Sequence, residues 1–176
     1  MKKTITKLVT FMLMGITLFA QASDKQLDAK LAMFADYLGT WQSNFTVAPG
    51  KPSVTDVSMW ERALNGKAVR TLHSINNGEY GGESLIFFDK EKDSLVFYYF
   101  TTAGFYTSGT IEVINETQFV AYEDVSGNDS GITKVKSTSD LQEDKLLVST
   151  SYLKNGKWTE PEQRVYTKSD RKVIFK

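Results

Sequence analysis

The chain contains no cysteine, only one histidine and only three prolines. The absence of cysteine excludes disulfides, thiolate metal ligands, a thiol nucleophile and a lipid-anchored cysteine behind a signal sequence. A single histidine leaves only carboxylates to complete a zinc shell, so we expect no metal site. The sequence also carries no excess charge, with 21 basic and 21 acidic residues.

The N-terminus has the pattern of a signal peptide. Residues 1–7 are basic, residues 8–20 are apolar, and Ala20-Gln21-Ala22 has the form of a signal-peptidase site. The apolar run is shorter than the roughly 20 residues that span a bilayer. We therefore expect residues 1–22 to be cleaved, leaving a periplasmic or secreted protein without stable membrane insertion. Cleavage removes three lysines and no acid, and the resulting acidic balance argues against nucleic acid as a partner.

The spacing of apolar residues predicts one helix followed by many strands. Residues 23–38 carry an apolar stripe at helical spacing: Leu27, Leu31, Phe34 and Leu38. After Gly39 the period changes to two, and turn sequences with Asn-Gly pairs, such as LNGK (64–67), separate short β-rich runs. We predict ten strands, over residues 40–48, 53–63, 67–76, 82–89, 94–101, 105–114, 117–125, 131–140, 145–153 and 158–168.

Sequential hairpins of this kind form a meander, and closing the sheet removes its exposed edges. The sequence therefore predicts an all-β fold: a ten-stranded antiparallel up-and-down barrel over residues 39–168, with a short N-terminal helix at its entrance. The tail, residues 169–176, either extends the last strand or lies free.

Gly39-Thr40-Trp41 joins the predicted helix to the first strand. Glycine permits a tight turn there, and the Trp41 indole can plug the closed end of a barrel if its N–H finds a partner. Further along lie WERALNGK (60–67), a glycine-rich turn, GESLIFFD (82–89) and an aromatic strand ending near Gly104 and Gly109. This order of segments resembles the calycin superfamily of lipocalins, fatty-acid-binding proteins and nitrobindin-like proteins, most closely its uncharacterised bacterial calycin-like domains.

Residues 163–168 (QRVYTK) include an Arg-x-Tyr sequence. It is similar to the last strand of fatty-acid-binding proteins, which implies that Arg164 and Tyr166 point inward and hold a ligand carboxylate. Residues i and i+2 of a strand do face the same way. Val165 is nevertheless the more natural interior residue, which favours an outward Arg164. An inward Arg164 would need a carboxylate from the ligand or from the protein, where the candidates are Glu61, Glu112 and Glu123.

Six of the 22 aromatic residues lie in residues 97–106 (FYYFTTAGFY). Strand alternation gives both faces aromatic rings, with Phe97 and Tyr99 on one of them. Such rings either fill a core or line a cavity, and a buried phenol needs a hydrogen-bond partner that a ligand can supply. We expect the apolar wall of a ligand site to include Phe97, Tyr99, Phe105 and Tyr122.

Other candidate sites are weaker. His73, the single histidine, is expected at the surface or as a satisfied core residue. Nitrobindin-like proteins imply a haem-binding histidine late in the chain and none follows residue 73, so we expect no cofactor. The acidic segment 123–131 lacks EF-hand spacing and has the composition of a hairpin turn. No motif marks a nucleophile, although three strand-borne acids could act as acid or base if buried: Asp56, Glu61 and Glu83.

These features favour a protein that binds or carries a small apolar or amphiphilic molecule, such as a fatty acid, in a mostly apolar cavity. Two alternatives stay open. One is an enzyme, a hydrolase or isomerase that uses a buried carboxylate or tyrosine, although no catalytic residue is indicated. The other is a protein-interaction module whose barrel is simply packed. The fold is compatible with all three, and the sequence does not indicate an oligomeric state.

Overall fold

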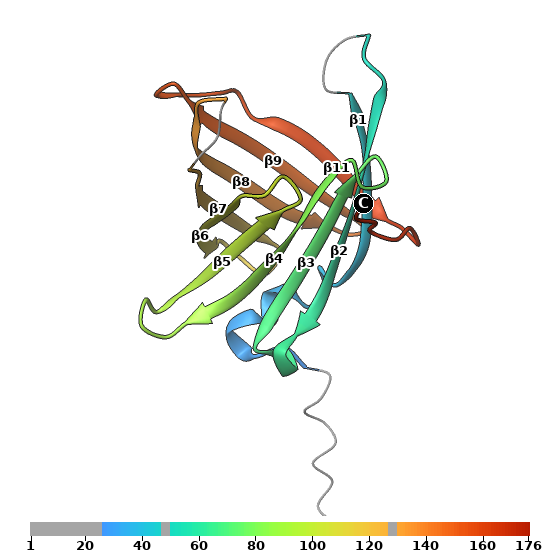
Figure 1. Cartoon of the computed structure of the whole chain (residues 1–176). Coiled ribbons are helices and arrows are strands. Elements are labelled where there is room, and N and C mark those ends of the chain that lie inside the picture. The colour runs from blue at the N-terminus through green and yellow to red at the C-terminus, as the bar shows by residue number, and fades with distance from the viewer. Residues whose placement is uncertain (1–25, 47–49, 127–129) are drawn as a thin grey trace, which may run out of the picture.

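The computed structural model describes residues 26–46, 50–126 and 130–176 (Figure 1). The predicted signal peptide, the first residues of the predicted helix and positions 127–129 of the acidic segment lie outside these ranges. Ten antiparallel strands form a closed up-and-down barrel, in which each strand pairs with the next and β11 pairs with both β9 and β1. The predicted all-β meander is therefore confirmed.

The barrel strands are β1 (Gly39–Thr46), β2 (Ser53–Ala63), β3 (Ala68–Ile75), β4 (Tyr80–Asp89), β5 (Ser94–Thr101), β6 (Tyr106–Val113), β7 (Gln118–Asp124), β8 (Ile132–Gln142), β9 (Lys145–Lys154) and β11 (Glu162–Lys168). The predicted last strand is interrupted. Its beginning forms the two-residue β10 (Lys157–Trp158), which pairs only with β9, and Pro161 precedes β11. Proline has no N–H to give to a strand ladder, which suits this break.

The N-terminal helix is much shorter than predicted. In place of a helix over residues 23–38 there is a six-residue 3-10 helix, η1 (Ala29–Phe34), capped by the Asp28 side chain. The preceding segment is tied to the barrel instead, because the Asp28 N–H donates to the Gly66 carbonyl and the Gln26 carbonyl accepts from Arg62. A second 3-10 turn, η2 (Leu64–Gly66), connects β2 to β3.

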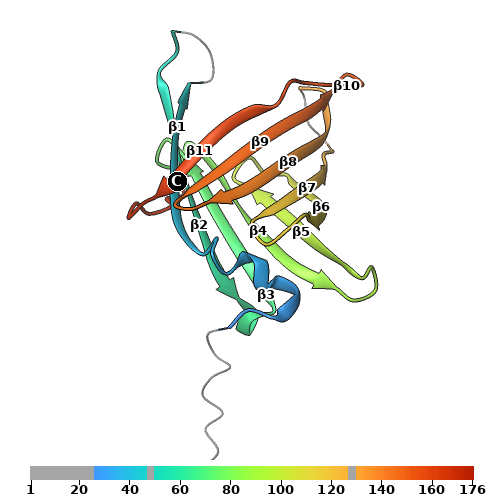
Figure 2. The same ribbon diagram turned by 180° about the vertical axis from the view of Figure 1, so that it is seen from behind.

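One end of the barrel is plugged by aromatic side chains. Figure 1 and Figure 2 show η1 lying across this end. Trp41 is fully buried, and its indole N–H donates to the Tyr37 carbonyl over 2.7 Å. Tyr37 in turn donates to the Thr117 carbonyl over 2.6 Å, which joins the segment after η1 to the opposite wall. Gly39 enters β1 with a φ of +115°, a conformation that glycine adopts at no steric cost.

The C-terminal tail neither extends β11 nor lies free. The Ser169 N–H donates to the Thr40 carbonyl, and the Ile174 N–H donates to the hydroxyl of Ser74 on the outer face of β3. Phe175 lies against Gly81 of β4, where a side chain on the glycine would displace it. The tail is thus part of the outer wall. No helix in the described part of the chain is long and apolar enough to cross a membrane.

Candidate functional site

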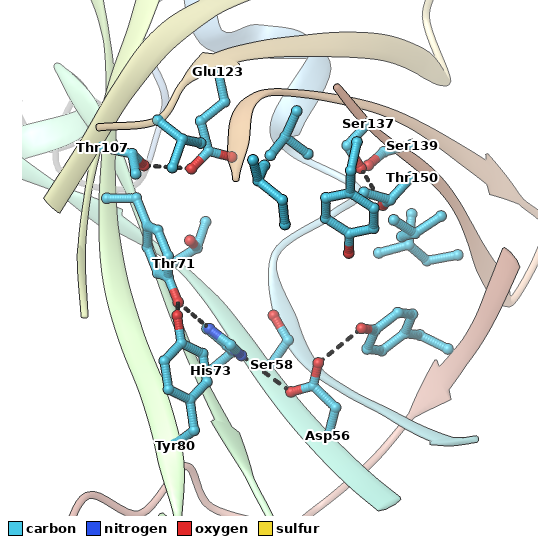
Figure 3. A pocket seen from close by; sticks show the side chains of 18 of the residues that line it. Asp56, Ser58, Thr71, His73, Tyr80, Thr107, Glu123, Ser137, Ser139 and Thr150 are labelled. Carbon is cyan, nitrogen blue, oxygen red and sulfur yellow. Dashed lines mark hydrogen bonds and ion pairs between the residues drawn. The ribbon is translucent and has the colours of Figure 1, made fainter. Parts of the chain in front are cut away.

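The barrel is hollow at the end opposite η1. A cavity of about 410 Å³ opens there, lined by side chains from the inward-facing positions of most strands (Figure 3). The lining is rich in hydroxyl groups, from Ser58, Thr71, Tyr80, Tyr99, Thr107, Ser137, Ser139, Thr150, Tyr152 and Tyr166. Apolar side chains such as Trp60, Leu146 and Val148 lie between them, so the wall combines apolar surface with many hydroxyl groups.

Asp56 anchors a hydrogen-bond network in the cavity wall. It is buried near the start of β2, and one carboxylate oxygen accepts from the Tyr166 hydroxyl over 2.9 Å. The other lies 3.3 Å from Nδ1 of His73, whose Nε2 is 2.6 Å from the Tyr99 hydroxyl. Tyr99 is also 3.1 Å from the Tyr80 hydroxyl, so the network spans β11, β2, β3, β5 and β4. Figure 3 shows these polar groups converging on the cavity.

Burial favours the neutral form of two phenols in this network. It raises the pKa of Tyr99, and the hydrogen bond to Tyr80 raises it further. Burial also raises the pKa of Tyr166, and the adjacent Asp56 carboxylate adds to that effect. Both tyrosines therefore present neutral hydroxyls that can give or accept hydrogen bonds at physiological pH.

A second, smaller cavity of about 190 Å³ adjoins the first on the side of the core. Six residues line both spaces: Trp60, Thr71, Tyr99, Glu123, Ser137 and Ser139. The remaining wall of the smaller cavity is mainly apolar, formed by Ile86, Phe97, Ile111, Phe119 and Ala121. Several of these belong to the same core cluster as Trp41 and Phe34. The smaller cavity therefore brings additional apolar side chains next to the plug, while the residues that it shares with the main cavity keep hydroxyl and carboxylate groups in its wall.

Glu123 lies where the two cavities meet. The hydroxyl of Thr107 on β6 donates to one of its oxygens, and no cation of a described residue pairs with it. Burial raises the pKa of the Glu123 carboxyl, and the Thr107 hydrogen bond offsets this only in part. The ionised form of Glu123 therefore destabilises the folded protein.

Replacing Glu123 with glutamine should therefore stabilise the protein in a pH-dependent way. An unfolded glutamate titrates near pH 4.3, so the wild type loses stability as the pH rises from about 4 through the raised pKa of Glu123. We expect the melting temperature of Glu123→Gln to exceed that of the wild type at pH 7.5, by about 2–4 °C for each kcal/mol recovered. The gap should close at pH 4.

The control for this experiment is Glu112→Gln on the exposed outer face of β6. Differential scanning calorimetry of the three proteins at both pH values provides the measurement. A gap for Glu123→Gln that is equal or larger at pH 4 would contradict the assignment of Glu123 as a partly buried acid without a cationic partner.

Four of the six predicted ligand residues line the interior. Tyr99, Phe105 and Tyr166 line the main cavity, and Phe97 lines the smaller one. Tyr122 does not: it is 41% exposed on the outer face of β7, where its hydroxyl donates to Glu112. The expectation for Tyr122 is wrong because alternation along β7 turns its neighbours, Ala121 and Glu123, inward.

Arg164 shares the inner face of β11 with Tyr166, and Val165 is 49% exposed on the outside. The preference for an outward Arg164 is therefore wrong. The guanidinium nevertheless is not part of the cavity lining, although its charge acts on Tyr166 and Tyr152, which are. It packs 3.9 Å above the centre of the Phe45 ring, beyond the main cavity, with Glu162 at 3.7 Å.

The acidic candidates separate into two groups. Glu61 and Glu83 both pair with Arg70 on the outer face, at 3.0 and 2.7 Å, so they are excluded from the cavity. Asp56 and Glu123 are the carboxylates in the lining of the main cavity. Sequence reasoning missed the role of His73 within this wall. Strand alternation places His73 on the same face of β3 as Thr71, which could have indicated an inward side chain. Its hydrogen-bond partners, Asp56 and Tyr99, lie on other strands and could not be identified from the sequence around His73.

Fold and site together define a hollow antiparallel β-barrel with one plugged end and a polar internal cavity. No family model and no curated protein matches the chain. Solved structures with a similar fold include the crystal structure of Rv2717c from M. tuberculosis, with a TM-score of 0.56 and 12% sequence identity. The match covers 81% of this chain and 99% of Rv2717c, and at this identity it shows the fold alone.

Proposed function

We propose that the chain is a calycin-like protein, exported after signal cleavage, that binds and carries a small amphiphilic molecule inside its barrel. The observation that carries this proposal is the change in wall chemistry along the interior. Hydroxyls and the Asp56–His73 pair line the open end, and the smaller cavity near the plug adds the apolar side chains of Ile86, Phe97, Ile111 and Phe119 to the wall. A ligand with one polar and one apolar end complements this order.

The size and preformation of the site support the same function. Ligand pockets of small molecules commonly measure about 300–1,000 Å³ and place a few polar groups against an apolar wall. The cavity of about 410 Å³ falls within that range, and its polar groups are already held by one another. A preorganised wall lowers the entropic cost of binding.

The test begins with native mass spectrometry of the protein purified from its own host, which should reveal a bound small molecule. In solution, Trp60 lines both cavities and reports on them through its fluorescence. Thr150→Trp, which fills the main cavity from β9, should weaken binding of an apolar fluorescent probe by about tenfold or more, equivalent to about 1.4 kcal/mol.

Ser151→Trp is the matched control, because the next residue of β9 points away from the cavity. It should leave probe affinity unchanged. Equal weakening by both variants, together with repeated absence of a bound molecule, would overturn the proposal.

A further inference from the structure

Carboxylates dominate the charge of the barrel interior. The described residues that line the two cavities include Asp56 and Glu123, and His73 is their single basic residue, without any lysine or arginine. His73 and the Tyr166 hydroxyl both contact Asp56. Glu123 has only the Thr107 hydroxyl as a hydrogen-bond partner among the described residues, and that bond uses one of its two carboxylate oxygens. The uncompensated charge of the interior therefore lies at Glu123.

Glu123 lies where the polar head group of a bound amphiphile would be expected. It lines both cavities, with Ile111 and Phe119 on the apolar side and Thr107 on the hydroxyl side. Figure 3 shows Glu123 and Asp56 on opposite sides of the polar space. A polar group placed between them meets negative charge or hydrogen-bond acceptors from both directions.

We infer that the polar group of the ligand is a protonated amine, received by the Glu123 carboxylate at the junction of the two cavities. This inference rests on the proposed function and names its ligand class. An ammonium ion would supply the charge and the donors that the second oxygen of Glu123 lacks, in a partly buried site where charge interactions are stronger than in bulk water. Its apolar part would occupy the smaller cavity against Phe97 and Ile111.

The same arrangement disfavours a carboxylate head. An anion in the main cavity would face both Glu123 and Asp56, and like charges at close range cost free energy. Arg164 offsets this repulsion only in part: its guanidinium stacks on Phe45 outside the cavity lining, although its charge acts on Tyr166 and Tyr152 in the wall. The fatty-acid carboxylate implied by the Arg-x-Tyr resemblance is therefore the less favourable head group for this interior.

The inference is tested with three probes that share one apolar chain: octylamine, octanol and octanoate. Their dissociation constants are measured at pH 7.5 by calorimetry and from the intrinsic tryptophan fluorescence, to which Trp60 in the cavity wall contributes. We expect octylamine to bind about tenfold or more tightly than octanoate, since one close charge interaction is worth at least about 1.4 kcal/mol. Glu123→Gln should remove the advantage of octylamine over octanol when both are measured on that variant. Glu112→Gln, on the outer face, should change none of the three.

The possible results distinguish failure of the amine assignment from failure of the proposed carrier function. Binding of octanol with no preference for octylamine, or a preference that survives Glu123→Gln, would overturn the amine assignment and leave a carrier of neutral amphiphiles. Tighter binding of octanoate would overturn it in favour of an anionic ligand. Failure of all three probes, with no molecule detected by native mass spectrometry, would overturn the proposed function itself.

Discussion

Trp41→Ala is expected to lower the free energy of unfolding by about 3–5 kcal/mol, the usual cost of deleting a large buried aromatic side chain. The indole is fully buried at the plugged end of the barrel. Its loss opens a void beneath η1 and leaves the Tyr37 carbonyl without the indole N–H that it accepts. It also removes the ring above which the Lys168 ammonium sits, 3.7 Å from the centroid. Urea denaturation followed by circular dichroism measures the change.

Trp158→Ala provides the comparison, because Trp158 is half exposed on the short β10. A surface substitution of this kind usually changes stability by no more than about 0.5 kcal/mol. If the two variants unfold at similar urea concentrations, Trp41 does not hold the plug together and the packing described for this end is incorrect.

Gly109→Ala is expected to destabilise the barrel by about 3 kcal/mol, at the upper end of the range for overpacking. Gly109 of β6 lies opposite Phe97 of β5. A methyl group there would stand 2.7 Å from the Phe97 ring and would overlap the Tyr122 carbonyl oxygen of β7. The ring can shift, but the carbonyl belongs to a paired strand and moves only if the sheet distorts.

Thr110→Ala is the neighbouring control, since Thr110 lies exposed on the outer face of the same strand. We expect it to unfold within about 0.5 kcal/mol of the wild type. A Gly109→Ala protein as stable as this control would show that the Phe97 ring does not lie on the glycine.

The series of strands could be predicted because the conformation of a tight turn depends on only a few adjacent residues. Asn-Gly pairs and related sequences favour such turns, and the segments between successive turns are the strands. The helix was not predictable to the same degree. Periodicity over residues 23–38 indicated a short helix along that range, but the backbone at Gln26 and Asp28 is held by Arg62 and Gly66, and no local sequence pattern reports these contacts.

The direction of side chains on β11 depended on register. Val165 is the more hydrophobic residue, yet Tyr166 is the one turned to the interior, where its hydroxyl reaches Asp56. Successive residues of a strand face opposite sides, so a register shift of one residue would turn every side chain of β11 to the other face. The register is set by pairing with β9 and β1, and β1 is remote from β11 in sequence.

The polarity of the cavity could not be read from composition. Inward residues such as Ser137, Ser139 and Thr150 are ordinary strand residues, and nothing in their immediate neighbours distinguishes them from outward ones. Only closure of the sheet brings them to face the same space as Asp56 and Glu123.

Pairing of β1 with β11 has a consequence for how the chain folds. Trp41 and Gln42 meet Lys168 and Thr167, so the first strand receives its second neighbour only when the last one has been made. Until then one edge of β1 is open, and open edges invite pairing with other chains. Pairing between strands so far apart in the sequence also forms slowly. Refolding should therefore compete with association at high protein concentration, and a chain that ends before Glu162 would keep this edge open permanently.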